Sequence, residues 1–334
     1  MAVPSSPTVR RRQLAAELRR LRRAAKLTIE QVAEQLEWSQ GKVSKIENAR
    51  VSVLPRDVRH LLTAYGVGEG DEREALLALA AQSRKRGWWQ QYGEAVPEWF
   101  QTYVGLEAEA AAIARYQAEY VPGLLQTRGY AIAVHSAARI NASGQEIEQQ
   151  VAVRMERQAR LTGDGAPQLW VVLNEAVIRR LVGDRATMHE QLVKLSEESN
   201  APNITLQVLP FAAGAHPAMD SAFAMLTFDR PAAGDVVYFE YPTGALYVEK
   251  PDEVARYRLT FDHLRAVALS PDETRRLLAR SAEDLALSME VQSGRGPYRC
   301  HVAQVHLQQR HRRRLRGDSR HAWRRPRPAR LQKP

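Results

Sequence analysis

The stretch from Leu27 to Glu47, LTIEQVAEQLEWSQGKVSKIE, decides the fold of the N-terminal region. Thr28 stands where a helix begins, and Gln31 follows three residues later, which is the pattern of a capping box. Apolar residues then recur at helical spacing as far as Leu36. The sequence therefore predicts one short amphipathic helix that begins after Thr28 and ends near Leu36.

A second short helix is expected after the turn at Glu37 and Trp38. Ser39 is suited to cap it, and within SQGKVSKIE only Val43 and Ile46 fall on the inner face. The outer face suits a DNA major groove, because Gln pairs with adenine, Lys with guanine, and Ser with bases or phosphates. We expect Gln40 and Lys45 to contact bases within a recognition face made of Gln40, Gly41, Lys42, Ser44 and Lys45.

Helices on either side are expected to complete a small bundle. Leu14, Leu18 and Leu21 form one apolar stripe, so residues 12–26 are read as a helix otherwise covered by arginine, and another helix is expected from about residue 56 to 65. A small bundle whose basic face is merely solvated is the alternative interpretation. Nonspecific contacts with DNA phosphates are expected from the arginines Arg10, Arg11, Arg12, Arg19, Arg22, Arg23 and Arg50. The DNA-binding residues are expected to include Arg12, Arg50 and the two capping residues Thr28 and Ser39 as well as the recognition face.

Charge is distributed unevenly along the 334 residues, which have room for about two domains. Residues 1–66 carry 13 Lys and Arg against 6 Asp and Glu, residues 67–289 carry 22 against 30, and residues 290–334 carry 13 against 2. A basic head is typical of a protein that binds nucleic acid. The only cysteine is Cys300, and neither a signal peptide nor a membrane-spanning stretch is recognised, so we expect a cytoplasmic location and no membrane partner.

A second region begins where Gly87-Trp88-Trp89 interrupts a helix expected over residues 69–86. Its first half is read as helical over residues 105–120 and 146–161. Its second half contains apolar or β-branched runs bounded by Pro, Gly and Asp, with helices between them at residues 186–199 and 253–268. The strands are expected at residues 169–174, 204–210, 222–228, 236–241 and 245–250. This mixture predicts an α+β domain.

Catalytic signatures are absent from the second region, which has no nucleophile elbow, no phosphate-binding loop, no zinc-protease motif and no cysteine nucleophile. We therefore expect no enzyme activity, no catalytic residue, no cofactor and no metal. His216, near Asp220 in a loop of Gly and Pro, is interpreted as a structural histidine, with a general base or a ligand as the alternative.

Aromatic and acidic residues gather at the start of the second region. The aromatic group is interpreted as hydrophobic packing at a domain junction, with a ligand cage as the alternative, and it consists of Trp88, Trp89, Trp99 and Phe100. The acidic group is interpreted as a solvated helix face, and it consists of Glu107, Glu109 and Glu119.

The N-terminal region resembles the XRE family of phage-repressor-like helix-turn-helix domains, through the segments VAEQL, SQGKVSKIEN and LLTAYGV. The resemblance implies a domain that binds double-stranded DNA and places the recognition positions at Gln40, Gly41, Lys42, Ser44 and Lys45. Ile29 departs from the family, which usually has Gln there. Glu37 and Ala49 stand where the family commonly has Gly, a residue that tolerates positive φ, so we expect the fold to survive with lower stability.

The second region resembles the C-terminal domain of WhiJ-like regulators, which are abundant in Streptomyces. The resemblance runs from about Gly87 to Leu285 and includes GWWQQYGEAVPEWFQTYVGLEAEA, YVPGLLQTRGYA and RMERQARLT. Members of this family are typically encoded beside a small partner protein, and some such pairs behave like antitoxin and toxin. The resemblance implies a domain that binds this partner and that mediates dimerisation. A small-molecule sensor domain is the alternative.

The tail is strongly basic, and its functional interpretation is a disordered arm that strengthens DNA binding. Its Arg, His, Pro and Gln, without periodicity, are also what a GC-rich gene yields when it is read out of frame. Plausible codons for His301 to Leu315, read one base later, give TWRKSTYSNGTGGD, which resembles the signature of the small partner family. We therefore hypothesise that the tail arises from an overlapping gene or from a frameshift.

Together these observations predict an all-α, lambda-repressor-like helix-turn-helix domain followed by a mixed α+β domain. The expected function is sequence-specific DNA binding in transcription regulation, as a homodimer. An antitoxin-like protein that neutralises its small partner and autoregulates its operon is one alternative, and a metabolic enzyme fused to a DNA-binding head is another. The expected boundaries are a disordered N-terminus at 1–10, the helix-turn-helix domain at 11–67, a connecting helix at 68–86, the regulatory or partner-binding domain at 87–287 and a disordered basic tail at 288–334.

Overall fold

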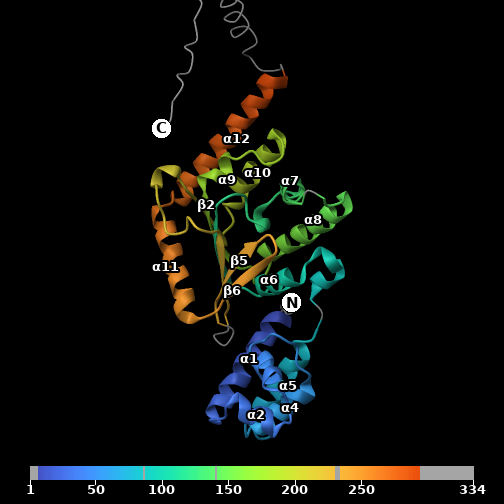
Figure 1. The fold of residues 1–334 in the computed structure, drawn as a ribbon. Coiled ribbons are helices and arrows are strands. Elements are labelled where there is room, and N and C mark those ends of the chain that lie inside the picture. The colour runs from blue at the N-terminus through green and yellow to red at the C-terminus, as the bar shows by residue number, and fades with distance from the viewer. Residues whose placement is uncertain (1–6, 86, 140, 230–233, 294–334) are drawn as a thin grey trace, which may run out of the picture. The chain divides into compact units, whose positions relative to one another are not determined.

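A computed structural model describes residues 7–293 of the protein, except residues 86, 140 and 230–233. A helical bundle is followed along the chain by a domain built on one sheet (Figure 1). The expected fold class, a helical domain followed by a mixed α and β domain, is confirmed. Within the described ranges, no helix is both long enough and apolar enough to cross a membrane.

The bundle owes its core to the apolar stripes that the sequence places on each helix. Leu18, Val32, Val43, Val58, Leu61 and Leu62 are completely buried in one cluster. The two central helices, which the capping residues predict, are short, and the last helix packs on the first and the fourth. The five helices are α1 (Pro7–Ala24), α2 (Ile29–Gln35), α3 (Gln40–Glu47), α4 (Pro55–Ala64) and α5 (Asp71–Gln82).

Two turns of the bundle have a positive φ at Glu37 and Ala49, the two positions where Gly is common in the family that this region resembles. The φ angle is 54° at Glu37, between α2 and α3, and 55° at Ala49, after α3. Each lies at the end of a helix, where the next N–H closes back on the helix: Trp38 donates to the Ala33 carbonyl at 2.8 Å and Arg50 to the Lys45 carbonyl at 2.9 Å. The backbone therefore keeps the helix-ending geometry that usually selects Gly, at some cost in strain.

Helices occupy part of each segment that the sequence predicts to be disordered. Helix α1 begins at Pro7, a residue suited to a first helical turn, and Val9 is buried, so the expectation of disorder is wrong for residues 7–10. Helix α12 (Pro271–Ser293) continues past residue 288, so that expectation is also wrong for residues 288–293. Residues 1–6 and the rest of the basic tail, 294–334, lie outside the described residues. The hypothesis that the tail arises from an overlapping gene or a frameshift concerns these residues and stays a hypothesis.

The second domain is built on a six-stranded mixed sheet with the strand order β3-β2-β1-β4-β5-β6. β1 pairs in parallel with β2, and β2 with β3, whereas β4, β5 and β6 continue from β1 in antiparallel pairs. The strands are β1 (Ala112–Gln117), β2 (Gln168–Asn174), β3 (Ile204–Leu209), β4 (Phe223–Thr227), β5 (Val236–Tyr241) and β6 (Gly244–Val248). Five of these six strands lie where apolar and β-branched runs predict them.

β1 corrects the prediction that residues 105–120 are helical. The helix α6 (Glu98–Glu107) ends at the start of that range, and β1 then pairs with β2 on one side and β4 on the other. The Ala and Glu of this segment favour a helix locally. Pairing on both edges and the burial of Ile113 and Tyr116 outweigh that preference.

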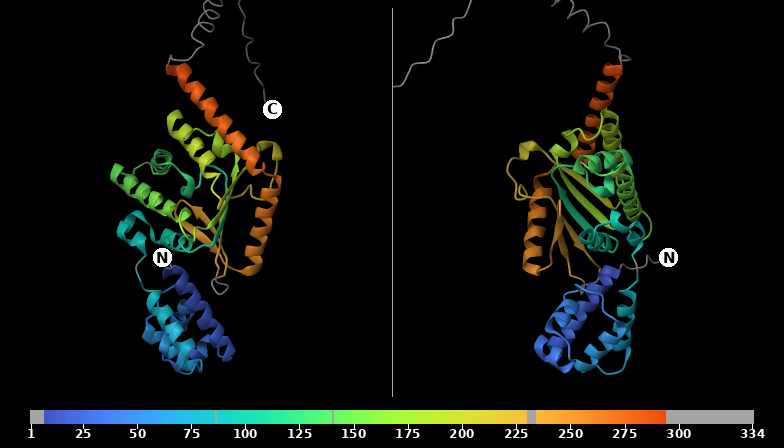
Figure 2. Two further views of the ribbon diagram at one scale, coloured as in Figure 1. Left: turned by 180° about the vertical axis from the view of Figure 1, so that it is seen from behind. Right: turned by 45° about the vertical axis from the view of Figure 1, so that its right-hand side comes forward.

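Helices lie on both faces of the sheet (Figure 2). On one face, α11 (Pro251–Val267) buries Val254, Phe261 and Leu264 against apolar side chains of the strands. The opposite side carries α7 (Arg128–Ala138), α8 (Gly144–Gln158) and α10 (Arg185–Glu198), as the two views together show. The remaining short elements are η1 (Trp88–Ala95), η2 (Gly123–Leu125), η3 (Ala159–Leu161), α9 (Glu175–Arg179) and η4 (Phe211–Ala213).

Candidate nucleic-acid interface

The two central helices of the bundle begin with the caps that the sequence predicts. Thr28 Oγ1 accepts a hydrogen bond from the Gln31 N–H at 3.2 Å, and Gln31 Oε1 accepts one from the Thr28 N–H at 2.9 Å. Ser39 Oγ accepts from the Lys42 N–H at 3.2 Å. These bonds fix where α2 and α3 start, and therefore which residues of α3 face outward.

The outward face of α3 is polar and carries no acidic residue in the first turn. Gln40, Gly41 and Lys45 are exposed on α3, and Arg50 is exposed just after it. Ser44 is half-buried, and its hydroxyl accepts a hydrogen bond from Asn48 Nδ2 at 3.3 Å. The positive end of the helix dipole, the amide of Gln40 and two cations are groups that bind phosphates and the edges of bases.

Lys42 differs from its neighbours because its side chain already has two partners within the bundle. Its ammonium lies 3.4 Å from the centroid of the Trp38 ring and 3.6 Å from the Asp57 carboxylate. A base contact by Lys42 therefore requires the side chain to leave these partners. The sequence gives one signal of this arrangement, since Trp38 precedes the cap and stands four residues before Lys42.

A buried carboxylate holds the end of α3 from behind. Glu47 is 2% exposed, accepts from Arg22 Nε at 2.9 Å and accepts from the Tyr65 hydroxyl at 3.0 Å. The hydrogen bond to Glu47 raises the pKa of Arg22, while burial, followed by the charge of Glu47, raises the pKa of Tyr65. Arg22, which the sequence assigns to a phosphate, is instead held inside the bundle with its NH1 group on the Leu27 carbonyl.

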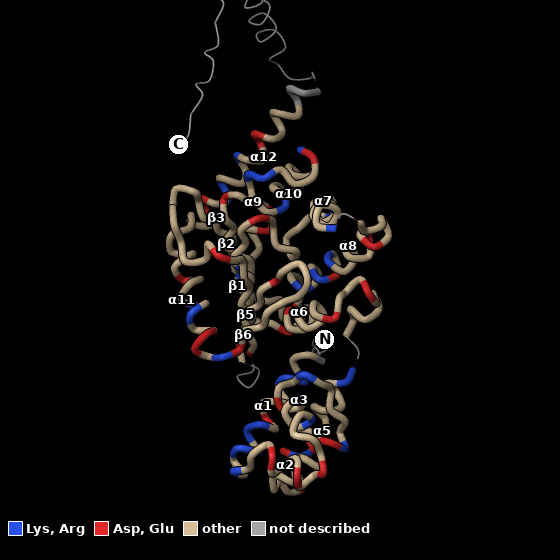
Figure 3. Tube along the Cα trace, viewed as in Figure 1, with Lys and Arg blue, Asp and Glu red and all other residues tan. Residues whose placement is uncertain are grey.

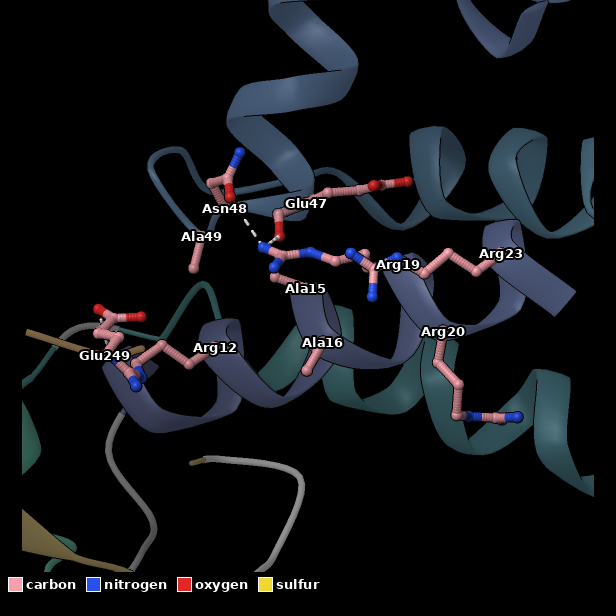
Figure 4. Close-up of a pocket in the computed structure, with 10 residues that line it drawn as sticks. All are labelled: Arg12, Ala15, Ala16, Arg19, Arg20, Arg23, Glu47, Asn48, Ala49 and Glu249. Carbon is pink, nitrogen blue, oxygen red and sulfur yellow. Dashed lines mark hydrogen bonds and ion pairs between the residues drawn. The ribbon is translucent and has the colours of Figure 1, made fainter. Parts of the chain in front are cut away.

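Basic residues recur along α1 (Figure 3). Four of its arginines, Arg12, Arg19, Arg20 and Arg23, line a hollow beside the end of α3 (Figure 4). Arg19 donates to the Glu47 carbonyl at 2.5 Å and to Asn48 Oδ1 at 2.8 Å, which satisfies the last turn of α3. Arg12 pairs with Glu249 at 2.5 Å. Six of the residues assigned to DNA thus lie on α3 or its cap: Ser39, Gln40, Gly41, Lys42, Ser44 and Lys45. Arg50 follows α3, Thr28 caps α2, and Arg12 lies apart on α1.

Comparison with known proteins agrees with this geometry. A model of the helix-turn-helix domain matches residues 13–76, and it indicates a DNA-binding regulator. A model described as a domain of unknown function (DUF5753) matches residues 100–280, which is more than half of the chain. The chain belongs to this family. No curated protein and no solved structure matches the chain significantly.

Within the DUF5753 domain, the structure places His216 in the fold of its own loop. Its Nδ1 accepts from the Ala218 N–H at 3.3 Å, and its Nε2 lies 3.3 Å from the Tyr116 hydroxyl. Both ring nitrogens therefore have intramolecular partners, which favours the structural interpretation. Among the described residues, no group of three or more His, Cys, Asp or Glu side chains is arranged to hold a metal ion.

Most of the aromatic group just before and within the DUF5753 domain packs in one apolar cluster, while Trp99 and Phe100 also line a cavity. Trp89 is buried with Val96, Val104 and Val153, and Trp88 and Phe100 pack against this cluster. The acidic group needs a correction, because Glu107 is buried and not solvated: it accepts from Arg157 Nε at 2.7 Å and from Arg157 NH2 at 2.8 Å. The sequence suggests a solvated face for Glu107 because it does not show that Arg157, 50 positions later, is its partner.

Proposed function

We propose that this protein is a sequence-specific DNA-binding transcription regulator that reads the major groove with the exposed face of α3, and that it is not an enzyme. The observation that carries the proposal is the capped α3 with Gln40, Gly41 and Lys45 exposed on a domain that matches the helix-turn-helix family. Gln40 and Lys45 have the donors and acceptors for adenine and guanine edges. Thr28 and Ser39 are included in the proposed DNA-binding surface, and Arg50 is assigned to phosphates.

The regulator is proposed to act as a homodimer. Helix α3 has only eight residues, so a single copy contacts few base pairs. Two copies on half-sites about one helical turn apart, about 10 base pairs, double the length of the site that is read. A footprint with two protected segments at this spacing supports the dimer, and a single protected segment argues against it.

The DUF5753 domain is proposed to bind a small partner protein and to transmit its presence to the DNA-binding domain. The support is the resemblance of the second region to WhiJ-like regulators, whose genes typically lie beside such a partner. A small protein that co-purifies and weakens DNA binding supports this regulation. A partner that is toxic alone and harmless in the complex favours the antitoxin alternative.

The test of DNA recognition is binding to the DNA upstream of the protein's own gene, compared with a scrambled sequence of equal length. The double variant Gln40→Ala/Lys45→Ala is expected to lose the preference for the upstream DNA, because it removes both side chains assigned to bases. The measurement is the dissociation constant on each DNA by fluorescence anisotropy. It is repeated at two salt concentrations, because phosphate contacts weaken steeply with salt.

The matched control is Gln82→Ala/Lys85→Ala, which removes the same two residue types at and just after the end of α5. Helix α5 packs on α1 and α4, away from the exposed face of α3. The control is expected to keep specific binding. Specific binding that survives in the Gln40→Ala/Lys45→Ala variant overturns the assignment of α3 as the reading helix.

A further inference from the structure

A half-open cavity in the DUF5753 domain lies between α6, α7, α8 and β5 and is unusually rich in positive charge. Its volume is about 70 Å³. Three arginines line it, against one carboxylate, and aromatic rings form part of the wall. Its lining includes Trp99, Phe100, His135, Arg139, Gln150, Arg154, Arg157 and Glu240.

Arg154 is a cation of this cavity whose hydrogen-bond partner is neutral. Its Nη1 group donates a hydrogen bond to Gln126 Oε1 at 2.6 Å. Its side chain also lies close to Gly123, because a Cβ added at that glycine would stand 3.4 Å from its Nε. In the described part of the chain, no carboxylate lies within ion-pair distance of its guanidinium, and Gln126 is a neutral partner. Burial, followed by the charge of Arg157, lowers the pKa of Arg154 to about 10.

Arg157, three positions further along α8, is a buried cation whose charge is neutralised within the fold. It forms two hydrogen bonds with the buried carboxylate of Glu107, and its guanidinium lies 5.0 Å from the centroid of the Phe100 ring. Burial alone would lower the pKa of Arg157, but Glu107 more than offsets this and raises it. A charged group at the neighbouring turn of α8 without such a partner is costly unless an anion supplies the missing charge.

His135 adds a buried donor that has no partner among the described residues. With the Gln150 amide oriented to satisfy both its ends, Gln150 donates to His135 Nδ1 at 2.9 Å and accepts from Arg139 at 2.6 and 3.0 Å. Burial, followed by the charges of Arg154 and Arg139, lowers the pKa of His135 to about 3, so the ring is neutral at pH 7. Its proton then resides on Nε2, a buried atom with no hydrogen-bond partner among the described residues.

The acidic residue of the cavity, Glu240, forms no ion pair with Arg154 in the described part of the chain, although its charge acts to raise the pKa of Arg154. Glu240 is exposed at the rim, where it accepts a hydrogen bond from the Tyr238 hydroxyl at 3.1 Å. The size of the cavity limits which part of a ligand it can hold, because pockets for whole drug-sized molecules measure about 300 Å³ or more. A volume of about 70 Å³ holds a few waters or one small charged group.

We propose that this cavity binds the carboxylate or phosphate group of a small molecule, with Arg154 and the Nε2–H of His135 as its central hydrogen-bond donors. A guanidinium presents two parallel N–H groups to such an anion. Arg139 at the rim adds a further positive charge, and the rest of the ligand lies over Trp99 and Phe100. The DUF5753 domain then binds a metabolite in addition to any protein partner.

The test is isothermal titration calorimetry on the full-length protein at constant ionic strength, with inorganic phosphate and benzoate as separate probes. At least one probe is expected to bind with one site per chain. Arg154→Gln is expected to weaken that binding by about tenfold or more, because a hydrogen bond to a charged group is lost. Binding of phosphate alone indicates a phosphorylated ligand, and binding of benzoate alone indicates a carboxylate ligand. Either outcome, or binding of both probes, supports the site.

Arg180→Gln is the matched control, since Arg180 is an exposed arginine that pairs with Glu119 on the surface, and it is expected to leave binding unchanged. This control matters because the basic DNA-binding domain also attracts phosphate. If Arg154→Gln fails to fold, Arg139→Gln at the exposed rim is expected to weaken binding severalfold. Absence of binding by both probes at millimolar concentration, or equal binding by the wild-type protein and the folded arginine variants, overturns the proposal.

Discussion

Each domain of this protein buries one glutamate against an arginine, but the two domains differ in what they do with their other cations. In the helix-turn-helix domain, Glu47 holds Arg22, while Lys45 and Arg50 face outward. In the DUF5753 domain, Glu107 holds Arg157, and a further guanidinium, Arg154, turns to a cavity with only a neutral partner. Surface cations suit a polyanion such as DNA, whereas a cation that lines a cavity suits a small anion.

The largest expected effect is the loss of the buried pair in the DUF5753 domain. Glu107→Gln leaves Arg157 without a counter-charge at a position where its side chain is only 5% exposed. Removing one partner of such a pair costs about 3–5 kcal/mol. We expect the free energy of unfolding of this domain to fall by that amount, measured by urea denaturation followed by circular dichroism.

Glu119→Gln is the control for this prediction, because the pair between Glu119 and Arg180 is exposed on both sides. Exposed pairs contribute about 0–1 kcal/mol, so a small change is expected. Glu107→Gln/Arg157→Met, which removes both charges, is expected to recover much of the stability. Equal effects of Glu107→Gln and Glu119→Gln would mean that the buried pair is not held as described.

The corresponding pair of the helix-turn-helix domain gives the second prediction. Glu47→Gln is expected to lower the free energy of unfolding by about 2–3 kcal/mol, below the range for a fully buried pair. The effect is smaller because Arg22 is 11% exposed and keeps its hydrogen bond to the Leu27 carbonyl. DNA affinity should fall as well, because Glu47 and Arg22 join the end of α3 to α1.

Glu34→Gln on the exposed face of α2 changes the same charge and is expected to alter stability by less than about 0.5 kcal/mol. Thermal unfolding and anisotropy measured on both variants separate the two contributions. A Glu47→Gln variant that is stable but no longer binds DNA would place Glu47 in recognition rather than in the fold.

The two domains also differ in how much of them the sequence predicts. The caps at Thr28 and Ser39, the exposed face of α3 and the turns at Glu37 and Ala49 all follow from residues within a few positions of one another. β1 was missed, because its partners in β2 and β4 are more than fifty positions away and its own residues favour a helix.

The same limit hid the candidate anion site. Arg154 and Arg157 stand three positions apart on one face of α8, which is a visible signal of a basic stripe. Whether such a stripe is solvated, paired or left facing a cavity depends on Glu107, Gln126 and His135, which come from other elements. Local patterns therefore identify the outward-facing site of this protein but not the inward-facing one.

The smallest expected effect concerns the turn after α3, where the substituted glycine can be restored. Ala49 has a φ of 55°, which costs an L-residue about 1–2 kcal/mol relative to Gly. Gly loses about 0.5–1 kcal/mol more in chain entropy, so Ala49→Gly should raise the free energy of unfolding by about 0.5–1 kcal/mol. Ala16→Gly inside α1 should lower it by about 1 kcal/mol. The measurement is the change in the free energy of unfolding of each variant by urea denaturation. Changes of opposite sign for Ala49→Gly and Ala16→Gly would show that backbone conformation decides the effect, whereas equal destabilisation by both would mean that the turn is not strained.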